Sequence, residues 1–298
     1  MSSSSSVPTI TFIGGGNMCE AILSGLLKTS HPQSHIRVSE PFDQRREYLN
    51  SKYGVDVFGD NKAAITGEGA KVSAGSPVDV VVLAVKPQVV GTVVRDVAPA
   101  LLKHKPLVIS IVAGVAIKDF ARWIHPDGAA GPSDAVPFVR LMPNTPALVG
   151  EGAAGMYAED TVNKEQRAQT EYVVKNIAKE YFWVDKESGI DAVTAISGSG
   201  PAYFFLILEA MEKTGVEMGL DRTVAGKLAA QTALGAARML LTGDDDVETL
   251  RRKVTSPNGT THAAIERMIA DKVPEGVSNG VLACRARCVS LADEFGKL

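Results

Sequence analysis

The sequence is poor in cysteine and carries no strong charge of either sign. Its three cysteines, Cys19, Cys284 and Cys288, are too few and too unevenly spaced for a disulfide framework or a zinc site, which fits a reducing compartment. The formal net charge is only −3, and lysines and arginines are scattered among carboxylates, so the basic patch of a nucleic-acid binder is missing. We expect no metal ion and no nucleic-acid partner.

Long hydrophobic runs are also scarce. The opening Met1–Ser6 lacks the apolar core of a signal peptide and the arginines of a transit peptide, and we expect a short disordered leader there. Apolar runs such as Val78–Val85 are too short to span a bilayer and are typical of strands buried on both faces. We therefore expect a cytoplasmic protein with no membrane partner.

The first half of the chain alternates short β-branched runs with helical stretches. From Pro8 to about Tyr157 this alternation predicts an α/β fold with a doubly wound sheet, and Pro126–Pro137, rich in Gly, Ala and Pro, is expected to be a surface loop. The expected strands are Thr9–Ile13, His35–Ser39, Val78–Val85, Leu107–Val112 and Phe138–Met142, followed by a pair at Gly155–Tyr157 and Tyr181–Val184. The expected helices are Met18–Leu27, Asp43–Tyr53, Asn61–Thr66, Val89–Leu101, Ile117–Ile124 and about Val162–Lys179.

After Asp185 the strand-like runs disappear and apolar residues recur at helical spacing, which predicts an all-helical second domain. Two helices are apolar nearly all round, through Phe204–Leu208 on the first and through Leu228, Ala229, Ala230, Ala233, Leu234, Ala236 and Ala237 on the next. Such helices need partners on more than one side, and we expect a second subunit to provide them. The expected helices are Pro201–Met218, Arg222–Leu241, Val247–Val254, Thr261–Asp271 and Val277–Phe295.

A glycine-rich turn follows the first strand and opens the first helix, the context in which such a turn binds a dinucleotide. Gly14 permits the tight turn, and Gly16 lets the backbone approach a pyrophosphate that the helix N-terminus favours. The third glycine of the G-x-G-x-x-G pattern is replaced by Cys19, which is small enough to keep the helix close to the sheet. A tight turn without a ligand is the simpler alternative.

The second strand ends in Ser39 and Glu40, at the distance expected for the residue that meets the adenosine ribose. A glutamate there favours the unphosphorylated ribose of NAD. Arg45 and Arg46 would equally suit a 2′-phosphate, or they belong to a solvated, charged helix face. The choice between NADH and NADPH stays open.

Three further strands end in short motifs at the edge where doubly wound sheets bind ligands. Asp79–Pro87 ends in a cation and a proline, and Ile111–Gly114 ends in small residues that would admit a nicotinamide ring. Arg140–Pro146 ends another strand. Structural turns explain each motif singly, but they do not easily explain three at successive strand ends.

The segment from Ser256 to Thr261 lies far from the N-terminus and just ahead of a helical run. Pro257 and Gly259 force a non-helical turn, and the N–H groups that open the next helix would point, unpaired, toward a bound carboxylate. The hydroxyls of Thr260 and Thr261 sit beside that anion site. The simpler alternative is that a threonine caps the helix.

Together these motifs resemble the pyrroline-5-carboxylate reductase family, in order and over nearly the whole chain. The resemblance implies a Rossmann NAD(P)-binding domain at residues 8–185 and a helical dimerisation and substrate-binding domain at residues 186–298. It also implies NAD(P)H-dependent reduction of the cyclic imine 1-pyrroline-5-carboxylate to L-proline, and homodimers that often assemble further into rings. The motifs that carry it are the Gly14–Met18 turn, Ala84–Pro87, Met142–Pro146, Ser197–Pro201 and Val254–Thr261, of which the last is the family's own signature.

The resemblance also implies site residues. Glu40 stands where relatives often carry Ser or Asn, and Asn258 and Thr260 replace a common Gly and Ala; Pro257 and Gly259 keep the turn. The implied cofactor contacts are Gly14, Gly15, Gly16, Asn17, Met18, Ser39, Glu40, Asn61, Ala84, Val85, Lys86, Pro87 and Ala113. The implied substrate contacts are Glu187, Ser256, Gly259, Thr260 and Thr261, with Thr261 as the catalytic candidate.

Two other functions fit part of the sequence. A β-hydroxyacid dehydrogenase has the same order of domains, but its chemistry needs an acid or base, usually a lysine on the helix after a glycine-rich turn; here the first lysine after Gly200 is Lys213. A non-catalytic NAD(P)H-sensing protein would have no reason for an anion site at Pro257–Thr261. Reduction of a protonated imine needs little acid–base machinery, which agrees with motifs that hold no cluster of His, Asp or Lys.

Overall fold

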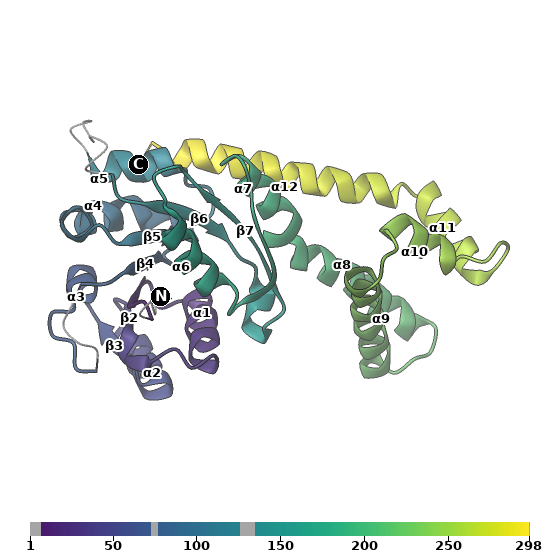
Figure 1. Ribbon diagram of the computed structural model, residues 1–298. Helices are drawn as coiled ribbons and strands as arrows, with labels where there is room; N and C mark the ends of the chain where they lie inside the picture. The colour runs from purple at the N-terminus through teal and green to yellow at the C-terminus, as the bar shows by residue number, and fades with distance from the viewer. Residues whose placement is uncertain (1–6, 73–76, 126–134, 298) are drawn as a thin grey trace. The chain divides into compact units, whose positions relative to one another are not determined.

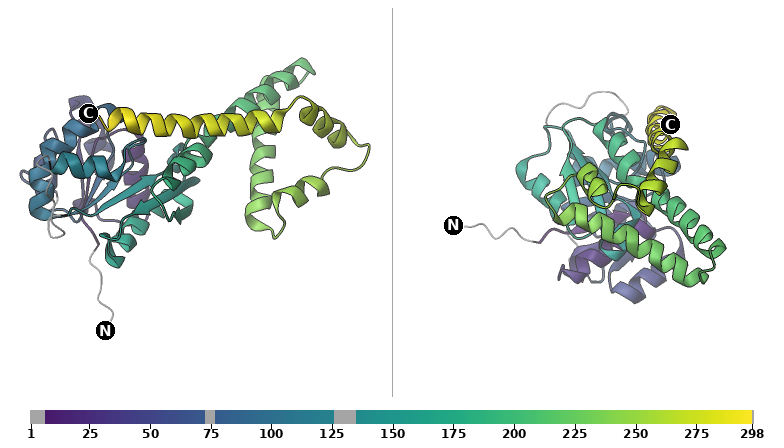
Figure 2. Two further views of the ribbon diagram at one scale, coloured as in Figure 1. Left: turned by 90° about the horizontal axis from the view of Figure 1, so that it is seen from above. Right: turned by 90° about the vertical axis from the view of Figure 1, so that its right-hand side faces the viewer.

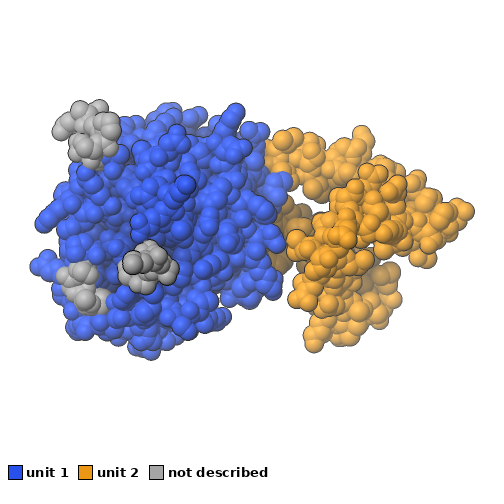
Figure 3. All heavy atoms as spheres, in the orientation of Figure 1, with its two compact units in different colours: residues 1–198, 284–298 blue, residues 199–283 orange. Residues whose placement is uncertain are grey.

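The computed structural model describes residues 7–72, 77–125 and 135–297 (Figure 1). The expected leader at Met1–Ser6 and most of the expected loop at Pro126–Pro137 lie outside this part of the chain. The chain divides into two compact units: unit 1 comprises residues 1–198 and 284–298, and unit 2 comprises residues 199–283 (Figure 3).

Unit 1 is built on one eight-stranded sheet with the strand order β3-β2-β1-β4-β5-β6-β7-β8. The first six strands of this order are parallel neighbours, β7 is antiparallel to β6, and β8 is parallel to β7. This confirms the predicted doubly wound α/β sheet. The strand order reverses at β1, which lies between β2 and β4. The strands are β1 (Ile10–Ile13), β2 (Ile36–Ser39), β3 (Asp56–Phe58), β4 (Val80–Leu83), β5 (Leu107–Ser110), β6 (Phe138–Met142), β7 (Gly152–Ala158) and β8 (Ala178–Trp183).

The sheet is covered by helices on both faces (Figure 2). Alternate residues of β4 show the two layers: Val80 and Val82 pack in one core cluster, and Val81 and Leu83 in the other. All residues of β1, β2, β4, β5 and β6 are buried, as parallel strands between two helical layers should be. The helices before the last strand are α1 (Asn17–Lys28), α2 (Asp43–Tyr53), α3 (Asn61–Thr66), α4 (Pro87–His104), α5 (Ile117–Ile124) and α6 (Lys164–Val174).

Two local predictions in unit 1 are wrong. Strand β3 was not expected, because three residues are too few to show an alternating pattern. The helix expected at about Val162–Lys179 ends at Val174, and Ala178 and Lys179 already belong to β8. Buried Ile177 and Ala178 pack in the sheet's core cluster, so tertiary burial outweighs the local helical pattern here.

The serine- and glycine-rich segment before Pro201 is helical. It forms α7 (Gly189–Val193) and then a π-helical turn (Thr194–Gly198). The Thr194 and Ser197 hydroxyls donate to the carbonyl oxygens of Ile190 and Val193, 2.8 and 3.1 Å away. These hydroxyls bond back to the preceding turn and so stay compatible with a helix.

The C-terminal residues return to unit 1. Helix α12 (Val273–Phe295) contributes its last residues there, with Phe295 buried in the core cluster under α4 and α5, and Leu291 packed against that cluster. Gly114, at φ +69°, lies directly under Leu291: a Cβ on this glycine would be 3.0 Å from the leucine Cβ. A glycine is therefore needed at this turn for two reasons, the backbone angle and the close helix.

Unit 2 is helical, as predicted, but many of its large apolar side chains are exposed. Helices α8 and α9 pack closely where Gly215 faces Ala225, whose Cβ would be 2.9 Å from a Cβ at position 215. By contrast, Phe204, Phe205 and Leu206 are 62%, 65% and 69% exposed. The helices are α8 (Gly200–Glu217), α9 (Arg222–Thr242), α10 (Val247–Lys253), α11 (Thr260–Ala270) and the first part of α12.

One apolar stretch reaches the length of a membrane span. The helical residues Gly189–Glu217, 29 in all, are long and apolar enough to cross a bilayer, and 22% of their most apolar window is buried in the chain. The expectation that apolar runs are too short does not hold for this stretch. Length and composition are weak evidence for a membrane, because core helices of soluble proteins meet the same criteria.

Candidate active site

The glycine-rich turn after β1 has the geometry that close approach of a ligand requires. Gly14 has φ +104°, and a Cβ there would lie 2.6 Å from the carbonyl oxygen of Ala84 at the end of β4. Its N–H donates to the carbonyl of Ser39, 2.8 Å away, at the end of β2. The turn is thus fixed to two neighbouring strands, and only glycine fits at position 14.

The start of α1 is open toward solvent. Gly16 caps this helix without a side-chain hydrogen bond, and a Cβ at this position would meet no atom within 4 Å. Cys19, at the third position of the motif, is fully buried in the core, and burial raises the pKa of its thiol above the usual range. The prediction that a small residue suffices for packing here is confirmed, and the uncapped N–H groups fit the pyrophosphate of a dinucleotide.

The end of β2 is tied to this turn by Glu40. One carboxylate oxygen, Oε2, accepts a hydrogen bond from the N–H of Gly15 at 2.9 Å, and Oε1 accepts one from the N–H of Phe42 at 3.1 Å. Ser39 donates its hydroxyl to Oδ1 of Asn61 at 2.6 Å. The fold therefore brings Gly15, Ser39, Glu40 and Asn61, all predicted cofactor contacts, to one sheet edge.

The arginines after β2 are not a solvated charge run. Arg45 donates to the carbonyl of Gly15 at 2.6 Å and to Glu20 at 2.7 Å. Arg46 donates to the carbonyl of Glu40 at 2.6 Å and pairs with Asp43. Both guanidinium groups are thus built into the loops that surround the glycine-rich turn.

The remaining predicted cofactor residues end β4 and β5 at the same edge. Ala84 and Val85 follow β4, Lys86 is the exposed cap of α4, and Pro87 is the first residue of that helix. Ala113 follows β5 and is partly exposed. Because parallel strands end at one edge, all these segments lie at the edge of the sheet where doubly wound folds bind ligands.

The Ser256–Thr261 turn in unit 2 is also exposed and uncapped. Gly259 is the cap residue of α11 and makes no side-chain hydrogen bond, so Thr260 and Thr261 are the first two helical residues. The alternative that a threonine side chain caps this helix is therefore wrong. Asn258 has φ +60°, a left-handed conformation that asparagine tolerates better than most residues. The departure from glycine at position 258 is thereby explained.

Glu187 in unit 1 holds other parts of the fold together. Its Oε1 accepts a hydrogen bond from the N–H of Ile117, the first residue of α5, at 2.7 Å, and pairs with Arg140 at 3.1 Å. Arg140 is 5% exposed. Nearby Asp191 has a raised pKa, because burial and Glu187 outweigh the attraction of Arg140 and Arg285. Glu187 thus has a bracing role in this unit, besides the substrate contact that the resemblance implies.

Sequence reasoning missed the bracing polar residues. Asn144, 8% exposed, accepts from the N–H of Ala153 at 2.9 Å and donates to the carbonyl of Ser197 at 3.1 Å. It joins the end of β6 to β7 and to the π-helical turn. A buried Arg and Asn within one strand-end motif were the available signal, since polar residues in a buried strand need partners.

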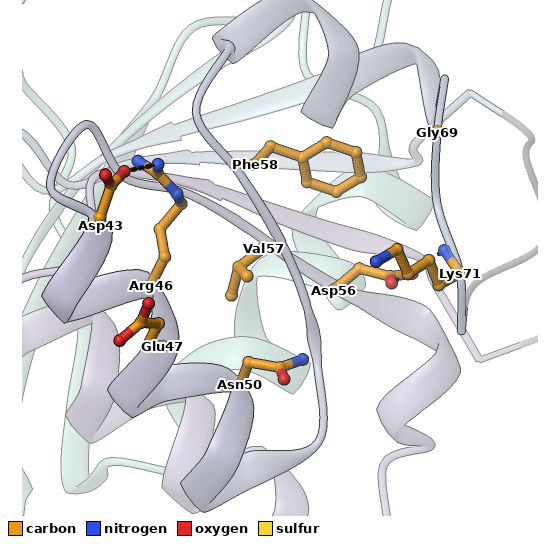
Figure 4. A pocket seen from close by; sticks show the side chains of 9 residues that line it. All are labelled: Asp43, Arg46, Glu47, Asn50, Asp56, Val57, Phe58, Gly69 and Lys71. Atoms are coloured by element: carbon orange, nitrogen blue, oxygen red, sulfur yellow. Dashed lines mark hydrogen bonds and ion pairs between the residues drawn. The ribbon is translucent and has the colours of Figure 1, made fainter.

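A hollow between α2 and β3 does not coincide with the predicted site (Figure 4). None of the predicted cofactor or substrate contacts lines it. Among the described residues, no group of three or more His, Cys, Asp or Glu side chains is placed to hold a metal ion. The lining residues are Asp43, Arg46, Glu47, Asn50, Asp56, Val57, Phe58, Gly69 and Lys71.

The fold and the glycine-rich turn are those of a dinucleotide-binding protein. A family model described as NADP oxidoreductase coenzyme F420-dependent matches residues 9–114, and one described as pyrroline-5-carboxylate reductase dimerisation matches residues 187–291. Pyrroline-5-carboxylate reductase from Pseudomonas aeruginosa is 40% identical over 98% of this chain and 100% of that protein. The Synechocystis enzyme of that name is 41% identical over 96% and 97%.

Solved structures of the same family are similar to this chain. A pyrroline-5-carboxylate reductase from Coxiella burnetii, 36% identical, superposes with a TM-score of 0.84 over 96% of this chain and 99% of that one. The Plasmodium falciparum pyrroline carboxylate reductase, with NADP bound, is 25% identical and gives a TM-score of 0.81 over 96% and 98%. The chain belongs to the pyrroline-5-carboxylate reductase family.

Proposed function

We propose that the chain reduces 1-pyrroline-5-carboxylate to L-proline with NAD(P)H and that two sites share this work. One is the sheet edge at the glycine-rich turn, and the other is the Ser256–Thr261 turn at the start of α11. The chain is an oxidoreductase that acts on a cyclic imine with NAD(P)H as cofactor, in proline biosynthesis. The crevice at the ends of β1, β2, β4 and β5 holds the cofactor. The Ser256–Thr261 turn and Glu187 provide the substrate contacts.

The observation that carries the substrate assignment is the uncapped start of α11. The Gly259 N–H donates to the carbonyl of Ser256 at 3.0 Å. The N–H groups of Thr260 and Thr261, which open the helix, have no side-chain cap, so they are available to hold the substrate carboxylate. The Thr261 hydroxyl accepts a hydrogen bond from the protonated ring nitrogen. Bound NAD(P)H supplies the hydride, which adds to the carbon of the C=N bond and leaves a neutral secondary amine.

Catalysis in this proposal is mainly positioning. The imine nitrogen takes its proton from water before binding, so the site does not need a general acid, and effective molarity from correct placement provides the rate. The cofactor contacts are Gly14, Gly15, Gly16, Asn17, Met18, Ser39, Glu40, Asn61, Ala84, Val85, Lys86, Pro87 and Ala113. The substrate contacts are Glu187, Ser256, Gly259, Thr260 and Thr261.

We place the domain boundary at 185/186, which the family match beginning at residue 187 supports. Residues 8–185 bind the cofactor, and residues 186–298 provide dimerisation and substrate binding. The homodimer assembles further into a ring of dimers and works in the cytoplasm, with no nucleic-acid or membrane partner. The exposed apolar surface of α8 supports the dimer.

Replacing Thr261 with alanine tests its role, and Thr223 provides a matched control. Each is the second helical residue after its cap, and each is exposed, but the α9 cap Asp221 bonds the N–H of Thr223. We expect Thr261→Ala to lower kcat/KM by about tenfold or more, the loss for about 1.4 kcal/mol of transition-state binding. Its melting temperature should barely change, because no cap is lost. Steady-state kinetics and thermal melting measure both.

Thr223→Ala should keep both turnover and melting temperature. If Thr261→Ala turns over pyrroline-5-carboxylate at the wild-type rate, the role assigned to Thr261 is wrong. An early melt with normal turnover would mean that the hydroxyl is structural.

A further inference from the structure

The carboxylate of Glu40 is fixed by two hydrogen bonds directly after β2, the place in doubly wound folds where an acidic residue meets the adenosine ribose. The residue is 7% exposed, and its two oxygens accept the N–H groups of Gly15 and Phe42. Its backbone N–H donates to the carbonyl of Phe58, 2.9 Å away. An acidic side chain at the end of the second strand accepts hydrogen bonds from the hydroxyls of an unphosphorylated ribose. It would repel a phosphate on the same sugar.

The cations that could compensate for this charge are already bound within the protein. Arg45 bonds Gly15 and Glu20 and stacks on Tyr48, with 4.9 Å from its guanidinium carbon to the ring centre. Arg46 holds the carbonyl of Glu40 with one nitrogen. Its other end points to Asp43 at the start of α2 (Figure 4). Each arginine is therefore paired with a carboxylate of its own.

We propose that Glu40 makes this chain prefer NADH to NADPH. The proposal rests on the assignment of the glycine-rich crevice as the cofactor site, and it refines that assignment. A 2′-phosphate carries between one and two negative charges at neutral pH, as phosphate monoesters do. Placed beside a poorly exposed carboxylate, it meets a repulsion that solvent screens only in part.

Arg46 is the residue that could weaken this preference. Its partner Asp43 is 81% exposed at the side chain, and exposed ion pairs contribute little, so the guanidinium is able to turn toward a phosphate. Arg46 contacts the backbone carbonyl of Glu40, so it would place a positive charge near the phosphate but would not remove the glutamate's charge. Arg46 should therefore reduce the preference for NADH over NADPH, but it should not reverse it.

Direct binding of the two cofactors tests the proposal without the reaction. Calorimetric titration of the full-length protein with NADH and with NADPH, in the absence of substrate, gives the ratio of dissociation constants. We expect NADPH to bind about tenfold or more weakly than NADH, and Glu40→Gln to reduce this ratio by about tenfold, because the variant removes the charge and keeps the shape. Glu47→Gln is the matched control, since it removes one exposed charge from α2, the helix that follows Glu40, and should leave the ratio unchanged.

Equal or tighter binding of NADPH by the wild-type protein would overturn the proposal, and this result does not depend on any variant folding. An unchanged ratio in Glu40→Gln, or an equal change in Glu47→Gln, would also overturn it. Turnover of pyrroline-5-carboxylate is measured separately. A protein that shows the expected binding ratio but no turnover would contradict the proposed function and leave this inference supported.

Discussion

The two units of the chain treat their apolar side chains in opposite ways. In unit 1, the strand residues Ile10, Phe12 and Val82 are fully buried between helical layers. In unit 2, Phe205 on α8 and Leu241 on α9 are 65% and 67% exposed. Burial of a side chain of this size is worth about 1.5–3 kcal/mol, so unit 1 completes its own core while unit 2 leaves much of that free energy unused.

This difference explains how the two halves divide their work. Unit 1 can hold a cofactor crevice in a fixed shape, because its strand ends are braced by buried contacts such as Gly14 against Ala84. The exposed helices of unit 2 lie within the residues that match the dimerisation model. A second copy of the chain, bound through the same surface, would bury these side chains.

The largest expected effect is on assembly. Phe205→Asp places a charge on the exposed apolar surface of α8, and in a two-fold interface the change occurs twice. We expect the dissociation constant of the oligomer to rise by about a hundredfold or more, since two lost side-chain burials amount to about 3 kcal/mol at least. Sedimentation over a concentration series measures this.

Phe182→Asp is the control for this change, because Phe182 is 63% exposed on β8 of unit 1. It should leave the assembly intact. Assembly lost in both variants, or in neither, would remove the distinction between the two exposed surfaces.

A smaller effect is expected in the glycine-rich turn, where substitutions at Gly14 and Gly16 should distinguish an effect on stability from an effect on cofactor binding. Gly14→Ala forces a Cβ against the carbonyl of Ala84 at a left-handed φ, so it should cost about 1–3 kcal/mol of stability and abolish cofactor binding. Gly16→Ala meets no protein atom, so it should keep the wild-type melting temperature and weaken cofactor binding alone. Thermal melting and calorimetry measure the two effects. Equal melting temperatures would show that Gly14 is not constrained as described.

The smallest effect concerns ion pairs and pH. Burial disfavours the charge of Glu20, but hydrogen bonds from Tyr53, Lys52, Arg45 and Tyr48 outweigh it and lower its pKa from 4.5 to about 2. A lowered pKa in the folded state contributes stability above pH 4.5 that is lost as the pH falls toward 2. Glu20→Gln should therefore reduce stability at neutral pH and flatten its decline in this acid range, as followed by denaturant unfolding.

The matched change in unit 2 is Glu209→Gln. Glu209 pairs with Lys213 on an exposed helix face, and such pairs contribute little. Its effect on stability should be close to zero at every pH. A loss as large as that of Glu20→Gln would contradict the contrast between the two units' ion pairs.

Much of unit 1 could be predicted because its helix ends carry local signals. Helices α2 and α3 end as predicted at Tyr53 and Thr66, where Gly54 and Gly67 follow in a left-handed conformation, the usual helix stop. The end of α6 carries no such glycine, and there the predicted boundary was wrong. The π-helical turn could not be predicted from Ser and Gly, because its form depends on hydroxyl bonds to the preceding turn.

The candidate site was predictable in its parts but not in its contacts. The glycine pattern and the position of Glu40 were visible in the sequence. The bond from Gly15 to Glu40 joins residues 25 positions apart, and that from Ile117 to Glu187 joins residues 70 apart. Such contacts depend on strand pairing, which local pattern does not reveal.

The measurement that tests the account most directly is oxidation of NADH and NADPH by the purified protein with and without pyrroline-5-carboxylate. We expect oxidation that depends on the imine and forms one L-proline for each cofactor oxidised, faster at low cofactor concentration with NADH. Binding of the cofactor without oxidation when pyrroline-5-carboxylate is added would contradict the assignment of this chain as a reductase.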